Sequence, residues 1–162
     1  MKLRDQICSL ELAKLLKGLG VEQESLFYHY QEKTPKSTND HCYGYKQEDM
    51  PWKIDSTRPD RLSTLRPRVH EWCSAFTSAE LGDMLPANTD HYRLMMWKLD
   101  STSPGGDRTL YGCSYGYPDR LHALPEFPVW ETFVNPNEAE SRGMLLCYLI
   151  NTFGLKVMRR DK

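Results

Sequence analysis

The sequence predicts an α+β domain: a mostly antiparallel sheet of about five or six strands with an N-terminal helix, a short middle helix and a long C-terminal helix. Two observations lead to this prediction. Residues 9–19 and 135–154 place apolar side chains at helical spacing, and the chain between them contains segments of alternating polarity. Because short turns join several of these segments, we expect a meandering sheet with the two longer helices packed on one of its faces.

The N-terminal part of the chain begins with the helix predicted over residues 9–19, which Gly20 closes. Residues 26–30 are aromatic and apolar and read as a strand, and a charged loop separates them from a second predicted strand at 41–46. Residues 47–68 show no periodicity and contain three prolines, so we expect a long irregular excursion there.

The middle of the chain alternates strands with one short helix. A strand is expected at 69–76, and Thr77 and Glu80 form a capping box that starts a helix at 78–85, ending before Pro86. Residues 91–99 and 109–115 alternate as strands do, and the connector between them, 103–107, has hairpin chemistry. A proline-dotted loop then leads to a last strand at 129–134.

The C-terminal helix is the strongest single prediction. Asn135 is expected to cap it, Pro136 to occupy its first position, Glu138 to complete a capping box and Gly154 to end it. The apolar face that should cover the sheet is formed by Ala139, Gly143, Leu146, Cys147, Leu149, Ile150 and Phe153.

On the other side of this helix, Met144 and Tyr148 stack one turn apart. They predict a second, lighter contact, either with another helix or with another subunit in a homodimer. A polar tail, residues 156–162, follows the helix, so the single domain is expected to span residues 1–155.

Composition excludes several classes of protein. A net charge of −1 argues against a duplex-DNA binder, and no apolar run is long enough to span a membrane. The charged N-terminal residues do not resemble a signal peptide, so we expect a cytoplasmic protein. The five cysteines form no C-x-x-C pair and are expected to be reduced and structural.

Three segments, residues 9–28, 75–86 and 137–150, resemble a group of short bacteriophage and mobile-element proteins to which no activity is assigned. The shared motifs read SLELAKxLKxLG, TxAELGxMLP and EAxxRxxMLxYL. The resemblance implies a phage accessory protein that acts inside a bacterial host cell. The stretch 31–68 departs from the group because it is longer and richer in arginine.

Catalytic and metal-binding patterns are weak. Residues 112–116 spell G-x-S-x-G around Ser114, but a nucleophile elbow needs a strand, a tight turn and a helix, and the local pattern is that of a hairpin strand. The histidines show no ligand spacing, so no catalytic site, metal or cofactor is expected.

The best candidate for binding is the arginine-rich excursion between two tryptophans. Guanidinium groups bind phosphate or carboxylate and stack on aromatic rings, although Asp55 and Asp60 could neutralise them in a solvated loop. Arg142 lies beside the apolar face of the last helix, where its stem can follow the core or its head can meet an anion. The predicted binding residues are Trp52, Arg58, Arg61, Arg66, Arg68, Trp72 and Arg142.

These observations favour a phage-type accessory binding protein without catalytic activity. It would inhibit a host defence factor or sequester a small phosphorylated ligand. Two alternatives stay open: a small enzyme of unrecognised type using His29, His91 or Asp119, and a protein that self-assembles through Met144 and Tyr148.

Overall fold

The computed structural model describes residues 3–33, 50–58, 69–87, 93–103, 106–116 and 132–157. It confirms the α+β class: the described residues form three α-helices and six strands, and every paired strand is antiparallel to its neighbour. In chain order the elements are the 3-10 helix η1 (Leu3–Asp5), α1 (Leu10–Gly18), β1 (Tyr28–Glu32), β2 (Trp52–Asp55), β3 (Val69–Ser74), α2 (Ser78–Met84), β4 (Arg93–Ser103), β5 (Gly106–Gly116), β6 (Phe133–Asn135) and α3 (Glu138–Phe153).

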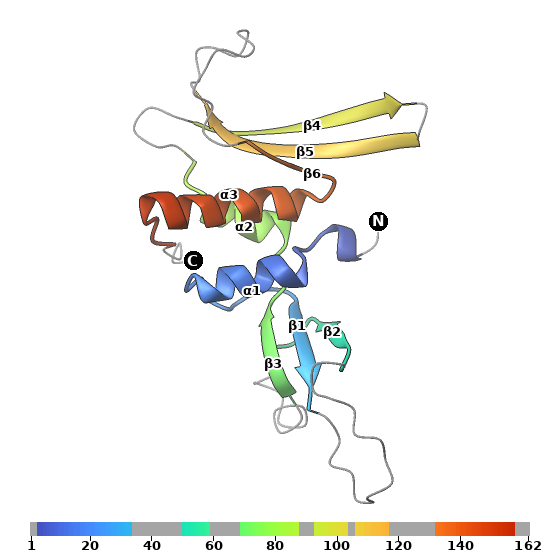
Figure 1. Cartoon of the computed structure of the whole chain (residues 1–162), viewed down its shortest axis with the longest axis vertical. Helices are drawn as coiled ribbons and strands as arrows, with labels where there is room; N and C mark the ends of the chain where they lie inside the picture. Colours follow the sequence, from blue (N-terminus) through green and yellow to red (C-terminus); the bar gives the residue numbers. More distant parts are fainter. Residues whose placement is uncertain are drawn as a thin grey trace, which may run out of the picture.

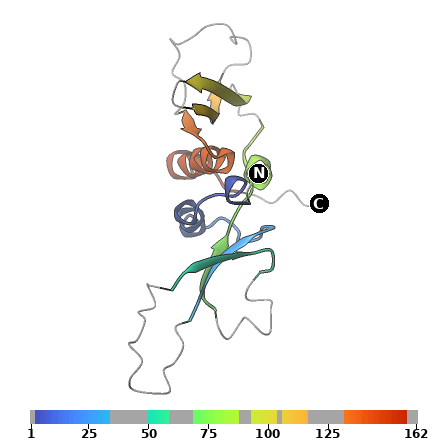
Figure 2. The same cartoon turned by 90° about the vertical axis from the view of Figure 1, so that its right-hand side faces the viewer.

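The strands belong to two sheets, which lie at opposite ends of a helical layer (Figures 1 and 2). One sheet has the order β2-β1-β3 and the other β4-β5-β6. The helix α3 contacts β5 and β6 on one side and α1 and α2 on the other, and α1 in turn contacts β3. The helices therefore lie between two sheets instead of sharing one face of a single sheet. No helix among the described residues is long and apolar enough to cross a membrane.

The N-terminus of α3 differs from the prediction. Asn137, not Asn135, caps the helix, and its side chain accepts the Ala139 N–H at 2.8 Å. Asn135 ends β6, and its side-chain oxygen accepts the Asn137 N–H at 2.9 Å, so Pro136 lies before the helix. Glu138 is then the first helical residue and cannot close a capping box; it pairs with Arg142 instead.

The predicted C-terminus is confirmed, since Gly154 ends α3 in the left-handed conformation with φ at 63°. The predicted apolar face is buried as far as Leu149, but Phe153 is 52% exposed. Leu145 and Ser141, which lie outside that face, are buried as well. More of the circumference is covered than expected because β5 and β6 pack on one side of the helix and α1 and α2 on the other.

Two close approaches on α3 explain this packing. A Cβ on Gly143 would lie 2.5 Å from Leu12 Cδ2, so glycine allows α1 to approach α3. On the other side Tyr148 packs against Phe133, with 5.9 Å between ring centroids. The prediction named another helix or another subunit as the partner on this side, whereas Tyr148 contacts Phe133 of the strand β6. Met144 is 39% exposed.

The caps of the two shorter helices follow the sequence. Ser9 caps α1, and Gly20, with φ at 81°, lies just beyond its C-terminus. Thr77 and Glu80 form the predicted capping box of α2. The Glu80 carboxylate also accepts the Leu26 N–H at 2.8 Å, which ties α2 to the segment that leads into β1.

The smaller sheet contains one strand that the sequence analysis placed in an irregular excursion. Residues 52–55 form β2, which pairs with β1 from Tyr28↔Asp55 to Gln31↔Trp52. The alternation of this four-residue strand is too short to stand out among the prolines that follow it. The strand predicted at 26–30 is shifted by two residues, since β1 runs from Tyr28 to Glu32. The strand expected at 41–46 lies outside the described residues.

The larger sheet is dominated by the predicted hairpin. β4 and β5 pair over eleven residues each, from Arg93↔Gly116 to Ser103↔Gly106, which confirms a hairpin at the predicted connector. β6 adds three residues, and half of the strand expected at 129–134 lies outside the described residues. Ser114 lies within β5 and is 1% exposed, so this serine does not occupy a nucleophile elbow.

Candidate binding site

Of the predicted arginine–tryptophan cluster, the structure brings together Arg58 and Trp72. The Arg58 guanidinium carbon lies 4.7 Å from the centroid of the Trp72 ring, and Arg58 Nη1 lies 3.7 Å from Glu24 Oε1. Arg61, Arg66 and Arg68 lie outside the described residues.

A second cation on the same ring comes from α1. Lys17 Nζ lies 5.4 Å from the Trp72 centroid and donates a hydrogen bond of 2.5 Å to the Trp72 carbonyl oxygen. Tyr28 supports the indole edge-on at 5.8 Å. We call Lys17, Arg58 and Trp72 the Trp72 cluster. Sequence reasoning missed Lys17, which comes from α1 and lies far from Arg58 and Trp72 in the chain.

Trp52 belongs to a different surface. Trp72 is opposite Tyr30 in the register, whereas Trp52 is opposite Gln31, so the two tryptophans point to opposite faces of the small sheet. Lys14 lies over the Trp52 ring at 4.3 Å, with its Nζ 4.0 Å from Glu71. The two predicted tryptophans therefore do not form one site.

Arg142 lies between α2 and α3, with its side chain 14% exposed. Its Nη1 donates to the Ser78 carbonyl oxygen at 2.7 Å, and its Nη2 donates to Glu138. Gly82 leaves room for this guanidinium, because a Cβ there would collide with it. Arg142 thus joins the first turns of two helices, and its predicted role in ligand binding stays a prediction.

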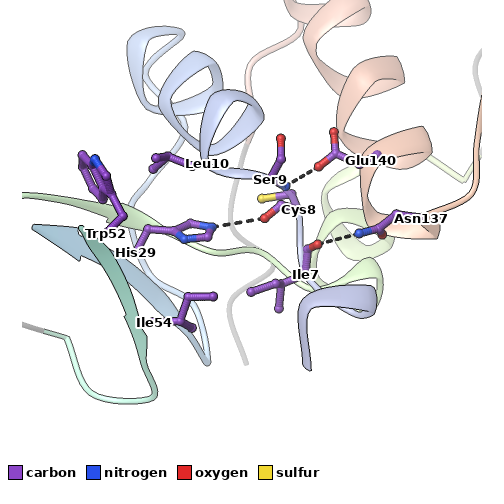
Figure 3. A pocket seen from close by; sticks show the side chains of 9 residues that line it. All are labelled: Ile7, Cys8, Ser9, Leu10, His29, Trp52, Ile54, Asn137 and Glu140. Atoms are coloured by element: carbon purple, nitrogen blue, oxygen red, sulfur yellow. Dashed lines mark hydrogen bonds between the residues drawn. The ribbon is translucent and has the colours of Figure 1, made fainter. Parts of the chain in front are cut away.

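A cleft of about 340 Å³ opens between the N-terminal segment, the small sheet and α3 (Figure 3). Sequence reasoning named His29 and Trp52 separately but did not predict a cleft, because its walls come from segments more than a hundred residues apart. It is lined by Ile7, Cys8, Ser9, Leu10, His29, Trp52, Ile54, Asn137 and Glu140.

His29 is the central polar group of this cleft, and it is 6% exposed. Its Nε2 lies 3.1 Å from the Cys8 carbonyl oxygen (Figure 3). Because a carbonyl oxygen can only accept, Nε2 carries the proton. Burial lowers the pKa of His29 below its ordinary value, so at neutral pH the ring is uncharged and Nδ1 is an acceptor.

Side chains at the start of α3 hold the N-terminal segment that forms one wall of the cleft. Glu140 accepts the Ser9 N–H, and Asn137 donates to the Ile7 carbonyl oxygen at 2.8 Å. Burial raises the pKa of the Cys8 thiol to about 12, so it is protonated at neutral pH and is not a nucleophile.

A second cleft of about 340 Å³ lies between the hairpin and the start of α3, where Lys98, Tyr111 and Arg142 contribute polar groups. Within the described ranges no three His, Cys, Asp or Glu side chains are grouped as a metal site would require. Cys8, Cys73, Cys113 and Cys147 are free and buried, in line with the structural role predicted for the cysteines.

Comparison with known protein families, with characterised proteins and with solved structures finds no match to this chain.

Proposed function

We propose that this protein is an accessory binding protein that docks onto an acidic surface of a bacterial host protein through the Trp72 cluster. The observation that carries the proposal is that two cations from distant segments, Lys17 and Arg58, both lie over one indole ring. The resemblance to phage proteins supplies the host context.

The chemistry of the cluster suits a protein surface. Tryptophan and arginine dominate the binding energy of protein interfaces, and a guanidinium can pair bidentately with a carboxylate. The side chain of Arg58 is 24% exposed, so a carboxylate of a partner can approach it from solvent.

A small phosphorylated ligand fits this cluster less well. Ligands of that size bind in enclosed sites, and neither of the two clefts described above is lined by Arg58, Lys17 or Trp72. Because neither of these clefts encloses the Trp72 cluster, the cluster favours a macromolecular partner over a sequestered small molecule.

The test is affinity capture from the bacterial host, with charge-neutralising variants expressed at equal levels. Loss of an interface hot spot of about 2 kcal/mol weakens binding about 30-fold, so Arg58→Gln and Lys17→Gln should lose the captured partner. Lys98→Gln is the matched control, because Lys98 is an exposed cation on β4, in the other sheet, and lies 3.3 Å from Asp100. Equal capture by all three variants would refute the proposal, as would a partner lost only with Lys98→Gln.

A further inference from the structure

We infer that the cleft between the N-terminal segment, the small sheet and α3 is a binding site for a small organic amine, a protonated nitrogen carried on an aromatic or aliphatic group. This inference is independent of the proposed function, since the cleft contains no member of the Trp72 cluster.

The first argument is the hydrogen-bonding character of the wall. His29 has its single N–H committed to the Cys8 carbonyl, which leaves Nδ1 as an acceptor. Among the described residues Glu140 accepts the Ser9 N–H through Oε1, which leaves Oε2 as a further acceptor. Figure 3 shows both side chains at the cleft, on either side of the segment that carries Cys8. A ligand group that meets either of these acceptors must therefore be a donor.

The second argument is charge. Glu140 is the only acidic residue among the nine that line the cleft, and none of the nine is a lysine or an arginine. Lys14 lies 4.3 Å from the centroid of the Trp52 ring, but its Nζ is 4.0 Å from Glu71 and it is not one of the lining residues. The lining of the cleft therefore favours a positive ligand and disfavours a carboxylate or a phosphate.

The third argument is the size and polarity of the rest of the cleft. A volume of about 340 Å³ falls at the small end of ligand sites, which hold roughly 300–1,000 Å³. Ile7, Leu10, Trp52 and Ile54 supply apolar side chains beside the acceptors. One ring bearing a short amine matches this division into an apolar part and an acceptor part.

The test compares benzylamine with benzoate, which have similar shape and opposite charge, by following backbone amide shifts of the full chain in NMR titrations. Benzylamine has about eight non-hydrogen atoms, so a Kd on the order of 1–10 mM is expected. The shifts should centre on residues 7–10, 29 and 52–54, and benzoate should cause none at the same concentrations.

Two variants separate the site from unspecific binding. Glu140→Gln keeps an acceptor for the Ser9 N–H but removes the charge, and should weaken benzylamine binding at least about tenfold. Ile54→Phe fills the cleft without touching Glu140 and should also abolish binding, whereas Glu32→Gln, a carboxylate outside the cleft, should leave the Kd unchanged. Equal binding of benzoate, shifts centred elsewhere, unchanged binding by both cleft variants, or no benzylamine binding at these concentrations would each overturn the inference.

Discussion

The helix α3 offers a sharp test of the packing, because two adjacent residues, Leu145 and Leu146, are both fully buried. Neighbours on a helix point about 100° apart, so burial of both requires cover on more than one side. Truncation of leucine to alanine removes about three carbon groups at roughly 0.8 kcal/mol each, and the cavity left behind adds to this loss. We expect Leu145→Ala and Leu146→Ala each to lower the free energy of unfolding by about 2–5 kcal/mol.

The assay is urea unfolding followed by circular dichroism, with Met144→Ala as the control. Met144 is the preceding residue on the same helix and is 39% exposed, so its truncation should cost less than about 1 kcal/mol. If Leu145→Ala behaves like Met144→Ala while Leu146→Ala is strongly destabilised, the helix has one buried face, and the arrangement between two layers is wrong.

Three further predictions concern titration, thiols and a helix cap. Burial lowers the pKa of His29, so below about pH 6.5 the unfolded chain binds a proton that the folded protein resists. The free energy of unfolding should therefore fall as the pH drops from 7.5 to 5, and it should fall less in His29→Gln. Equal dependence of the free energy of unfolding on pH in the two proteins would contradict this. Gly154→Ala should lower the free energy of unfolding, measured in urea, by about 1 kcal/mol, because the φ angle of Gly154 is 63°. Gly18→Ala should be neutral or stabilising, since a Cβ at Gly18 meets no atom within 4 Å. Equal effects of the two substitutions would refute the role of Gly154 as the left-handed cap of α3. Burial raises the pKa of four thiols, those of Cys8, Cys73, Cys113 and Cys147, to about 11–12. In Cys42→Ser protein, which lacks the fifth cysteine, these thiols should react with a disulfide reagent at pH 8 only after unfolding, and fast reaction of the native protein would contradict their burial.

The sequence predicted those parts of the fold that depend on local chemistry. The capping box of Thr77 and Glu80, the glycine that ends α3 and the β4–β5 hairpin were all predicted correctly, because each needs particular residue types at fixed spacing. The start of α3 was two residues out because Asn135 and Asn137 are both good caps and only pairing in β6 decides between them. Division of the strands into two sheets was missed because local patterns do not show which strands pair.

The candidate sites depend more heavily on long-range contacts. The sequence analysis expected arginines of this stretch to stack on tryptophan rings, but it could not choose between Trp52 and Trp72. The choice of Trp72 for Arg58 follows from the register of the small sheet. The cleft at His29 needed residues from both ends of the chain, and a buried histidine on a strand has no distinctive sequence pattern.

The most direct test of the proposed function is hydroxyl-radical footprinting of the protein alone and in the complex captured from the host. Trp72 reports on the proposed contact, and Met96, which is 50% exposed on β4, reports on the opposite end of the molecule. The proposed function predicts that oxidation of Trp72 falls in the complex while that of Met96 is unchanged. Protection of Met96 with unchanged oxidation of Trp72 would contradict it.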